Sequence, residues 1–134
     1  MAQILEVEGI GPVYAKKLAA VGITTTNKLL KMGATPKGRD ELAEKSGISK
    51  DLLLEWINHA DLFRIKGVAE EYSDLLEEAG VDTVPELAQR NPENLYAKLV
   101  EVNKEKKLVR QLPSMRQVAS WVEQAKSMPR MIHY

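Results

Sequence analysis

The feature of this sequence that most constrains its fold is an internal repeat. The tripeptide Glu8-Gly9-Ile10 is answered 58 residues later by Lys66-Gly67-Val68. The same spacing relates further pairs, namely Tyr14 and Tyr72, Leu18 and Leu76, Gly22 and Gly80, Ile23 and Val81, Thr25 and Thr83, and Leu29 and Leu87. After a short insertion in the second copy, Leu53-Trp56-Ile57 is answered by Val118-Trp121-Val122. Such recurrence indicates one supersecondary unit built twice. We expect repeat 1 over residues 1–61, repeat 2 over 62–127 and a C-terminal tail over 128–134.

Local sequence signals are helical throughout. Ile4, Val7 and Ile10 follow the spacing of a buried helix face, and Gly22 and Gly80 are typical helix stops. Prolines follow capping residues at Thr35-Pro36 and Asn91-Pro92, and capping boxes are expected at Thr83–Glu86 and Ser114–Gln117. No segment alternates as a strand does. We therefore expect an all-α fold in which two repeats, each too small to bury its apolar face well, pack into one compact globule.

Composition excludes several classes of protein. The 134 residues carry 19 basic and 19 acidic side chains, so no overall positive charge draws the chain to nucleic acid. There is no cysteine, which excludes disulfides and cysteine-ligated zinc and fits a reducing, cytoplasmic location. No apolar run approaches the ~18 residues of a membrane span, so we expect no membrane partner. The neutral total contains an acidic segment at 67–96 and a basic segment at 97–134.

The first repeat contains a distinctive glycine turn. Its pattern is Ile4-x-x-Val7-x-Gly9-Ile10-Gly11-x-x-x-Ala15-x-x-Leu18. Two glycines allow a sharp turn without side chains above it, and the helix that follows presents unpaired N–H groups and a partial positive charge. Such an end suits a phosphate group. The turn is equally a compact way to join two packed helices.

This pattern resembles the helix-hairpin-helix motif, which grips the nucleic-acid backbone without reading its sequence. The resemblance implies two tandem helix-hairpin-helix (SAM-like) repeats. It assigns a nucleic-acid site to Gly9, Ile10, Gly11, Val13, Lys16 and Lys17. Family hairpins also hold a monovalent cation on loop carbonyls, and the resemblance allows one here; we expect no other cofactor.

The second repeat departs from this pattern. Ala69 replaces Gly11, and Asp74-Leu75 replaces Lys16-Lys17. Further acids surround the turn at Glu70, Glu71, Glu77 and Glu78. Carboxylates at a helix N-terminus satisfy its dipole and repel a phosphate. We expect this turn to pack, or to present an acidic face to a partner.

The chain as a whole resembles an uncharacterised bacterial domain-of-unknown-function family of tandem helix-hairpin-helix proteins. The resemblance rests on residues 8–15, 56–67 and 79–83. The half-units are similar to the C-terminal domain of the RNA polymerase alpha subunit, which touches both DNA and activator proteins. The family implies a fold and no activity.

Catalytic chemistry has little support. Asn58-His59-Ala60-Asp61 is the densest polar cluster, yet it offers two metal ligands where zinc usually takes three or four. A basic segment at residues 104–116 is a second candidate surface, with solubility as the plainer interpretation, and the tail is apolar enough to dock. We expect a non-enzymatic binding protein without a metal or small-molecule ligand. Its partner is either a DNA or RNA backbone at the first turn, or another protein, with both turns structural.

Overall fold

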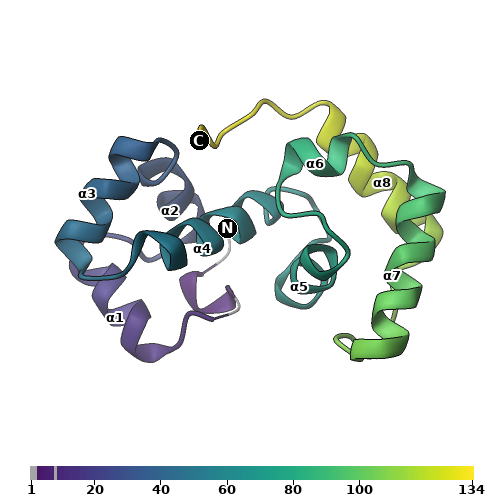
Figure 1. Cartoon of the computed structure of the whole chain (residues 1–134), viewed down its shortest axis with the longest axis horizontal. Helices are drawn as coiled ribbons and strands as arrows, with labels where there is room; N and C mark the ends of the chain where they lie inside the picture. Colours follow the sequence, from purple (N-terminus) through teal and green to yellow (C-terminus); the bar gives the residue numbers. More distant parts are fainter. Residues whose placement is uncertain (1–2, 8) are drawn as a thin grey trace. The chain divides into compact units, whose positions relative to one another are not determined.

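A computed structural model describes residues 3–7 and 9–134, except for the side chain of Glu70. Within that part of the chain there are eight α-helices, one 3-10 turn and no strand beyond a single β-bridge between Gln3 and Thr25, which confirms the all-α prediction (Figure 1). The elements are η1 (Ile4–Glu6), α1 (Pro12–Ala20), α2 (Thr26–Met32), α3 (Pro36–Ser46), α4 (Lys50–Leu62), α5 (Glu70–Glu78), α6 (Val84–Ala88), α7 (Pro92–Lys106) and α8 (Met115–Lys126). None of these helices is long and apolar enough to cross a membrane.

Contacts divide the chain into two compact units. Unit 1 comprises residues 1–61 together with 130–134, and unit 2 comprises residues 62–129. The last five residues therefore belong to unit 1, although they follow the second repeat in sequence. That the two repeats share one globule stays a prediction.

The same backbone hydrogen bonds recur in both units. The amide of Ile23 donates to the carbonyl of Leu18 over 2.9 Å, and the amide of Val81 donates to that of Leu76 over the same distance. Both bonds close a helix end at a glycine with positive φ, which is +87° at Gly22 and +92° at Gly80. A residue with left-handed φ after the last turn lets the following amide reach back to a free carbonyl. The repeat in sequence is thus also a repeat in backbone conformation.

Helix starts follow the expected capping chemistry with one exception. Ser114 forms the predicted capping box with Gln117, and the side chains of Thr35 and Asn91 each accept a bond from the first turn. Thr83 does not cap α6, because its hydroxyl lies 3.1 Å from a Glu86 carboxylate oxygen and donates to it instead. The capping box predicted at Thr83 is therefore wrong.

Each unit is built around a buried tryptophan. Trp56 on α4 is 1% exposed and Trp121 on α8 is 2% exposed. In unit 2 the buried apolar residues between Leu62 and Ala125 form one cluster, to which α5, α6, α7 and α8 all contribute. Burial of this kind stabilises a unit in proportion to the apolar area withdrawn from water.

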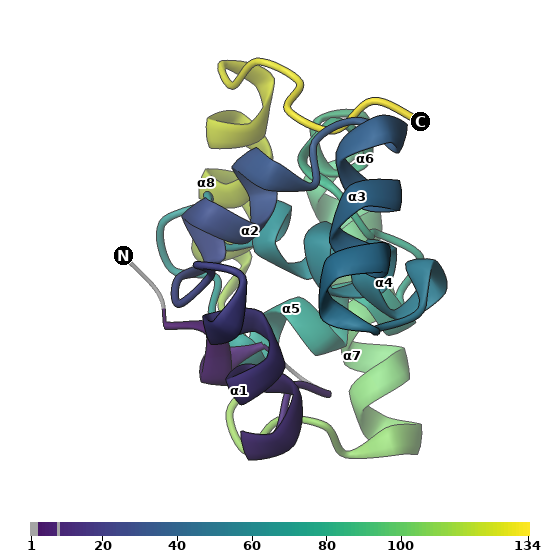
Figure 2. The ribbon, with the colours of Figure 1, turned by 90° about the vertical axis from the view of Figure 1, so that its left-hand side faces the viewer.

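The C-terminal tail docks on unit 1 (Figure 2). The amide of His133 donates to the carbonyl of Ala34 over 2.7 Å, and Ile132 is buried. The guanidinium of Arg39, itself buried, donates to the carbonyl of His133 over 2.8 Å and to that of Gly33 over 2.9 Å. The predicted docking of the tail thus occurs within the chain.

Candidate nucleic-acid interface

The first turn links η1 to α1 through two glycines with different roles. Gly9 has φ +92°, a conformation that only glycine adopts without strain, whereas Gly11 has φ −90° and lies at the N-cap of α1. Ile10 between them is buried, and its amide donates to the carbonyl of Val7 over 3.1 Å. The buried side chain of Ile10 therefore anchors the turn. The Ile10 amide, which belongs to the predicted site, already donates a hydrogen bond within the protein.

The N-terminus of α1 is open. Gly11 has no side chain to cap the helix, and Pro12 at the first helical position has no N–H group. The amides of Val13 and Tyr14 thus receive no side-chain cap of the kind that Thr25 gives to Lys28 at the start of α2. A Cβ atom built on Gly11 would meet no atom within 4 Å. Uncapped amides with free space in front of them are where a helix accepts an anion.

One exposed apolar side chain and two lysines follow this opening along α1, with Lys17 in the last turn of the helix. Lys16 and Lys17 are both exposed, and the Nζ atom of Lys17 lies 5.7 Å from the centre of the Tyr14 ring. Val13, in the first turn of α1, is 68% exposed. The structure thus places the predicted site residues Gly11, Val13, Lys16 and Lys17 on one short stretch of chain that begins at the open helix end.

The second turn has the same backbone and different chemistry. Gly67 has φ +97°, and Ala69 takes the N-cap of α5 with extended φ and ψ of −129° and −163°. Asp74 and the buried Leu75 stand where Lys16 and Lys17 stand in unit 1.

An ion pair ties α7 to α5. The Lys106 Nζ atom lies 2.6 Å from a Glu78 carboxylate oxygen. The hydrogen bond to Glu78 and the charge of that carboxylate raise the pKa of Lys106 above its ordinary value. One lysine of the predicted basic segment is therefore paired with an acid at the C-terminal end of α5, away from the second turn.

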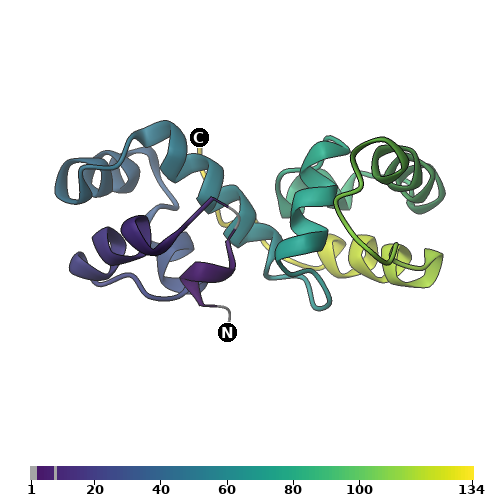
Figure 3. The same ribbon diagram turned by 90° about the horizontal axis from the view of Figure 1, so that it is seen from below.

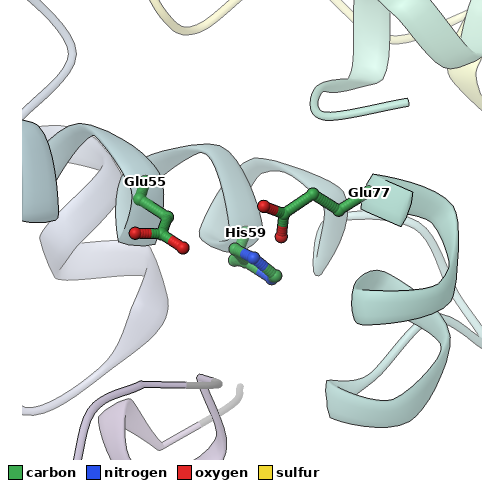
Figure 4. Close-up of side chains that lie close together, drawn as sticks. All are labelled: Glu55, His59 and Glu77. Carbon is green, nitrogen blue, oxygen red and sulfur yellow. The ribbon is translucent and has the colours of Figure 1, made fainter. Parts of the chain in front are cut away.

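The polar cluster predicted at residues 58–61 lies near the end of α4 in unit 1. His59 and Asp61 are buried near the end of α4, and both have interaction partners. Glu55 lies one helical turn before His59, as Figure 4 shows. Within unit 1 these two side chains offer two ligands from one helix, and the expectation that the chain holds no metal stays a prediction.

Unit 2 contains a feature that the sequence analysis missed. The segment between α4 and α5 lies beside α8 (Figure 3). Lys66 and Gly67 in this segment, with Arg116 and Ser120 on α8, line a depression of about 390 Å³. Arg116 belongs to the predicted basic segment 104–116, but the basic residues at 104–110 do not line the depression. The i, i+4 spacing of Arg116, Ser120 and Gln124 could have indicated that these polar side chains share one helix face.

The described residues form a small all-helical protein in which the N-termini of α1 and α5 both lack a side-chain cap, with lysines further along α1 and acids along α5. The chain belongs to the family described as Domain of unknown function (DUF4332), whose model matches residues 8–128. No solved structure matches it.

Proposed function

We propose that this protein binds the phosphate backbone of nucleic acid without sequence preference, through a helix-hairpin-helix turn at residues 9–17. Backbone amides at the start of α1 would contact one phosphate, and Lys16 and Lys17 would neutralise its neighbours. Contacts of this kind position a duplex or a single strand but do not discriminate between bases. The proposed role is binding, with no chemical step.

The observation that carries the proposal is that the fold does not require a glycine at position 11. Its φ of −90° is open to any residue, and a Cβ atom there would have no neighbour within 4 Å. Ala69 occupies the same N-cap position in unit 2 with a similar extended backbone. A glycine that packing does not demand supports a role in keeping the approach to the helix amides clear.

The test is a fluorescence-anisotropy titration of labelled duplex DNA, single-stranded DNA and RNA of equal length. We expect dissociation constants of ~10⁻⁴–10⁻⁶ M and a log–log salt slope of ~0.9 per phosphate neutralised on duplex DNA. The variant Lys16→Glu/Lys17→Glu should abolish binding, because it sets two carboxylates against the phosphates.

Its matched control is Lys28→Glu/Lys31→Glu, which makes the same change in charge at two exposed lysines of α2 in the same unit. If the two double variants weaken binding equally, general charge and not the turn is responsible, and the proposal fails. The absence of binding by the wild-type chain at low salt, with tens of micromolar protein, contradicts it as well.

The second candidate function is a protein-interaction adaptor. It is favoured by the exposure of two large apolar side chains of unit 1, Val13 at 68% and Leu5 at 56%. Exposed apolar side chains are common singly, but a docking surface needs them. A protein captured by the wild type and lost from a Val13→Asp variant, without any binding to nucleic acid, would favour this function.

A further inference from the structure

We propose that the depression beside Gly67 in unit 2 is a binding site for a phosphate group, separate from the first turn. It has a volume of about 390 Å³ and is open to solvent on one side. Its lining residues come from the start of the second turn and from one face of α8: Lys66, Gly67, Arg116, Gln117, Ser120, Trp121 and Gln124.

The lining has the chemistry that an oxyanion needs. Lys66 and Arg116 supply two positive charges, and none of the described lining residues is a carboxylate. An arginine guanidinium binds two phosphate oxygens side by side, and a lysine adds a point charge. Two cations without a competing acid favour a doubly charged phosphate over a singly charged anion.

Hydrogen bonds hold the wall of the depression in place. The Oε1 atom of Gln124 accepts from the amide of Lys66 over 2.9 Å, and its Nε2 atom donates to the Lys66 carbonyl over 3.2 Å. The same Nε2 atom lies 3.3 Å from the Oγ atom of Ser120 and donates to it. Because Ser120 accepts that bond, its own O–H group can donate to a phosphate oxygen.

Unit 1 shows that the fold does not require these charges. The equivalents of Lys66, Arg116 and Ser120 in the first repeat are Glu8, Asp51 and Glu55, all acids. The tryptophan beneath the turn is retained, as Trp56 in unit 1 and Trp121 in unit 2. The equivalent positions therefore carry three acids in the sequence of repeat 1, and two cations and a serine in repeat 2, so the positive lining is a property of the sequence of repeat 2 and not of the architecture.

The experiment is a titration of the full chain, labelled with nitrogen-15 for NMR, with inorganic phosphate at constant ionic strength. We expect saturable shifts of the Gly67 amide and of the Gln124 side-chain amide. In Arg116→Gln and Lys66→Gln the affinity should fall at least tenfold. Both side chains are exposed, so the variants should keep the wild-type spectrum elsewhere.

Two variants at cations outside the depression serve as controls. Arg110→Gln and Lys126→Gln remove exposed cations that do not line the depression, and they should leave the affinity unchanged. Equal losses in all four variants, or shifts that never saturate, overturn the proposal.

Oligonucleotides with and without a 5′-phosphate identify the natural source of the group. Preference for the phosphorylated strand indicates a terminal phosphate, and equal binding at the depression indicates backbone phosphates. If neither strand shifts these signals while inorganic phosphate does, the ligand is a small phosphate compound.

The variant Lys16→Glu/Lys17→Glu separates this site from the first turn. It should leave phosphate binding in unit 2 intact, whatever its effect on nucleic acid.

Discussion

The ring of Tyr14 packs edge-on against the ring of Trp56, with centroids 5.0 Å apart and planes at 61°. Tyr72 and Trp121 repeat the contact in unit 2, at 5.3 Å and 50°. Each pair joins the first helix after a glycine turn to the last long helix of the same unit. The first pair is edge-on and the second is tilted. Aromatic pairs at such distances add about 0.5–1.5 kcal/mol beyond the area they bury. The glycine turns are therefore held from beneath by aromatic packing.

The first prediction concerns these tryptophans. Trp56→Ala and Trp121→Ala should each lower the free energy of unfolding by about 3–5 kcal/mol, because each leaves a large cavity in a buried cluster. Denaturant titration followed by circular dichroism measures the loss. A loss below about 1 kcal/mol would contradict the burial of the side chain.

The second prediction concerns Gly9 and Gly67, whose φ values are +92° and +97°. A Cβ atom at either would lie 3.1 Å from the Nε1 atom of the tryptophan beneath it. The left-handed conformation alone costs a non-glycine residue about 1–2 kcal/mol. Gly9→Ala and Gly67→Ala should each lower the free energy of unfolding by more than that amount, because the indole ring must also shift.

Gly22 and Gly80 are the matched controls for this prediction. They share the positive φ, but a Cβ atom there would meet nothing within 4 Å. Their alanine variants should show the conformational cost alone, about 1–2 kcal/mol. Thermal or denaturant unfolding of the four variants measures the difference. An equal loss of stability in all four would show that the contact with the tryptophan adds nothing at Gly9 and Gly67.

The third prediction concerns Arg39 and the tail. Arg39→Met removes two charge-assisted bonds to backbone carbonyls and should cost about 2–3 kcal/mol. The amide of His133, which donates to Ala34, should then exchange its hydrogen faster. Lys37→Met, at an exposed position on the same helix, should change neither quantity. Unchanged exchange at His133 in the Arg39 variant would show that the arginine does not hold the tail.

The fourth prediction separates binding from stability at the first turn. Aspartate is a good N-cap and interacts favourably with the helix dipole. Gly11→Asp should therefore keep or raise stability, by about 0.5 kcal/mol, because it caps the free amides of α1. The same carboxylate should abolish nucleic-acid binding, since it occupies those amides and repels phosphate.

Ala69→Asp tests the same substitution at the second turn. It should stabilise unit 2 by about 0.5–2 kcal/mol and leave nucleic-acid binding unchanged. Anisotropy titration beside denaturation of both variants checks the contrast. Retention of full affinity by a folded Gly11→Asp protein would remove the α1 amides from the proposed interface.

The sequence alone determined the local architecture. Glycine with positive φ at positions 9, 22, 67 and 80, and capping side chains at Thr35, Asn91 and Ser114, depend on residues that are neighbours along the chain. Their backbone angles and first-turn hydrogen bonds are set over about four residues, so a repeated pattern predicts a repeated conformation. The all-α fold and the open first turn follow from such signals.

Only the tertiary structure decided which distant groups meet. The pairing of Lys66 with Gln124 and of Arg39 with His133 joins residues 58 and 94 positions apart. No local pattern encodes these contacts, because they depend on how helix faces pack and on which rotamers the core allows. For the same reason the acidic sequence around the second turn concealed a basic depression: its cations come from the residue before Gly67 and from α8, and packing brings them together.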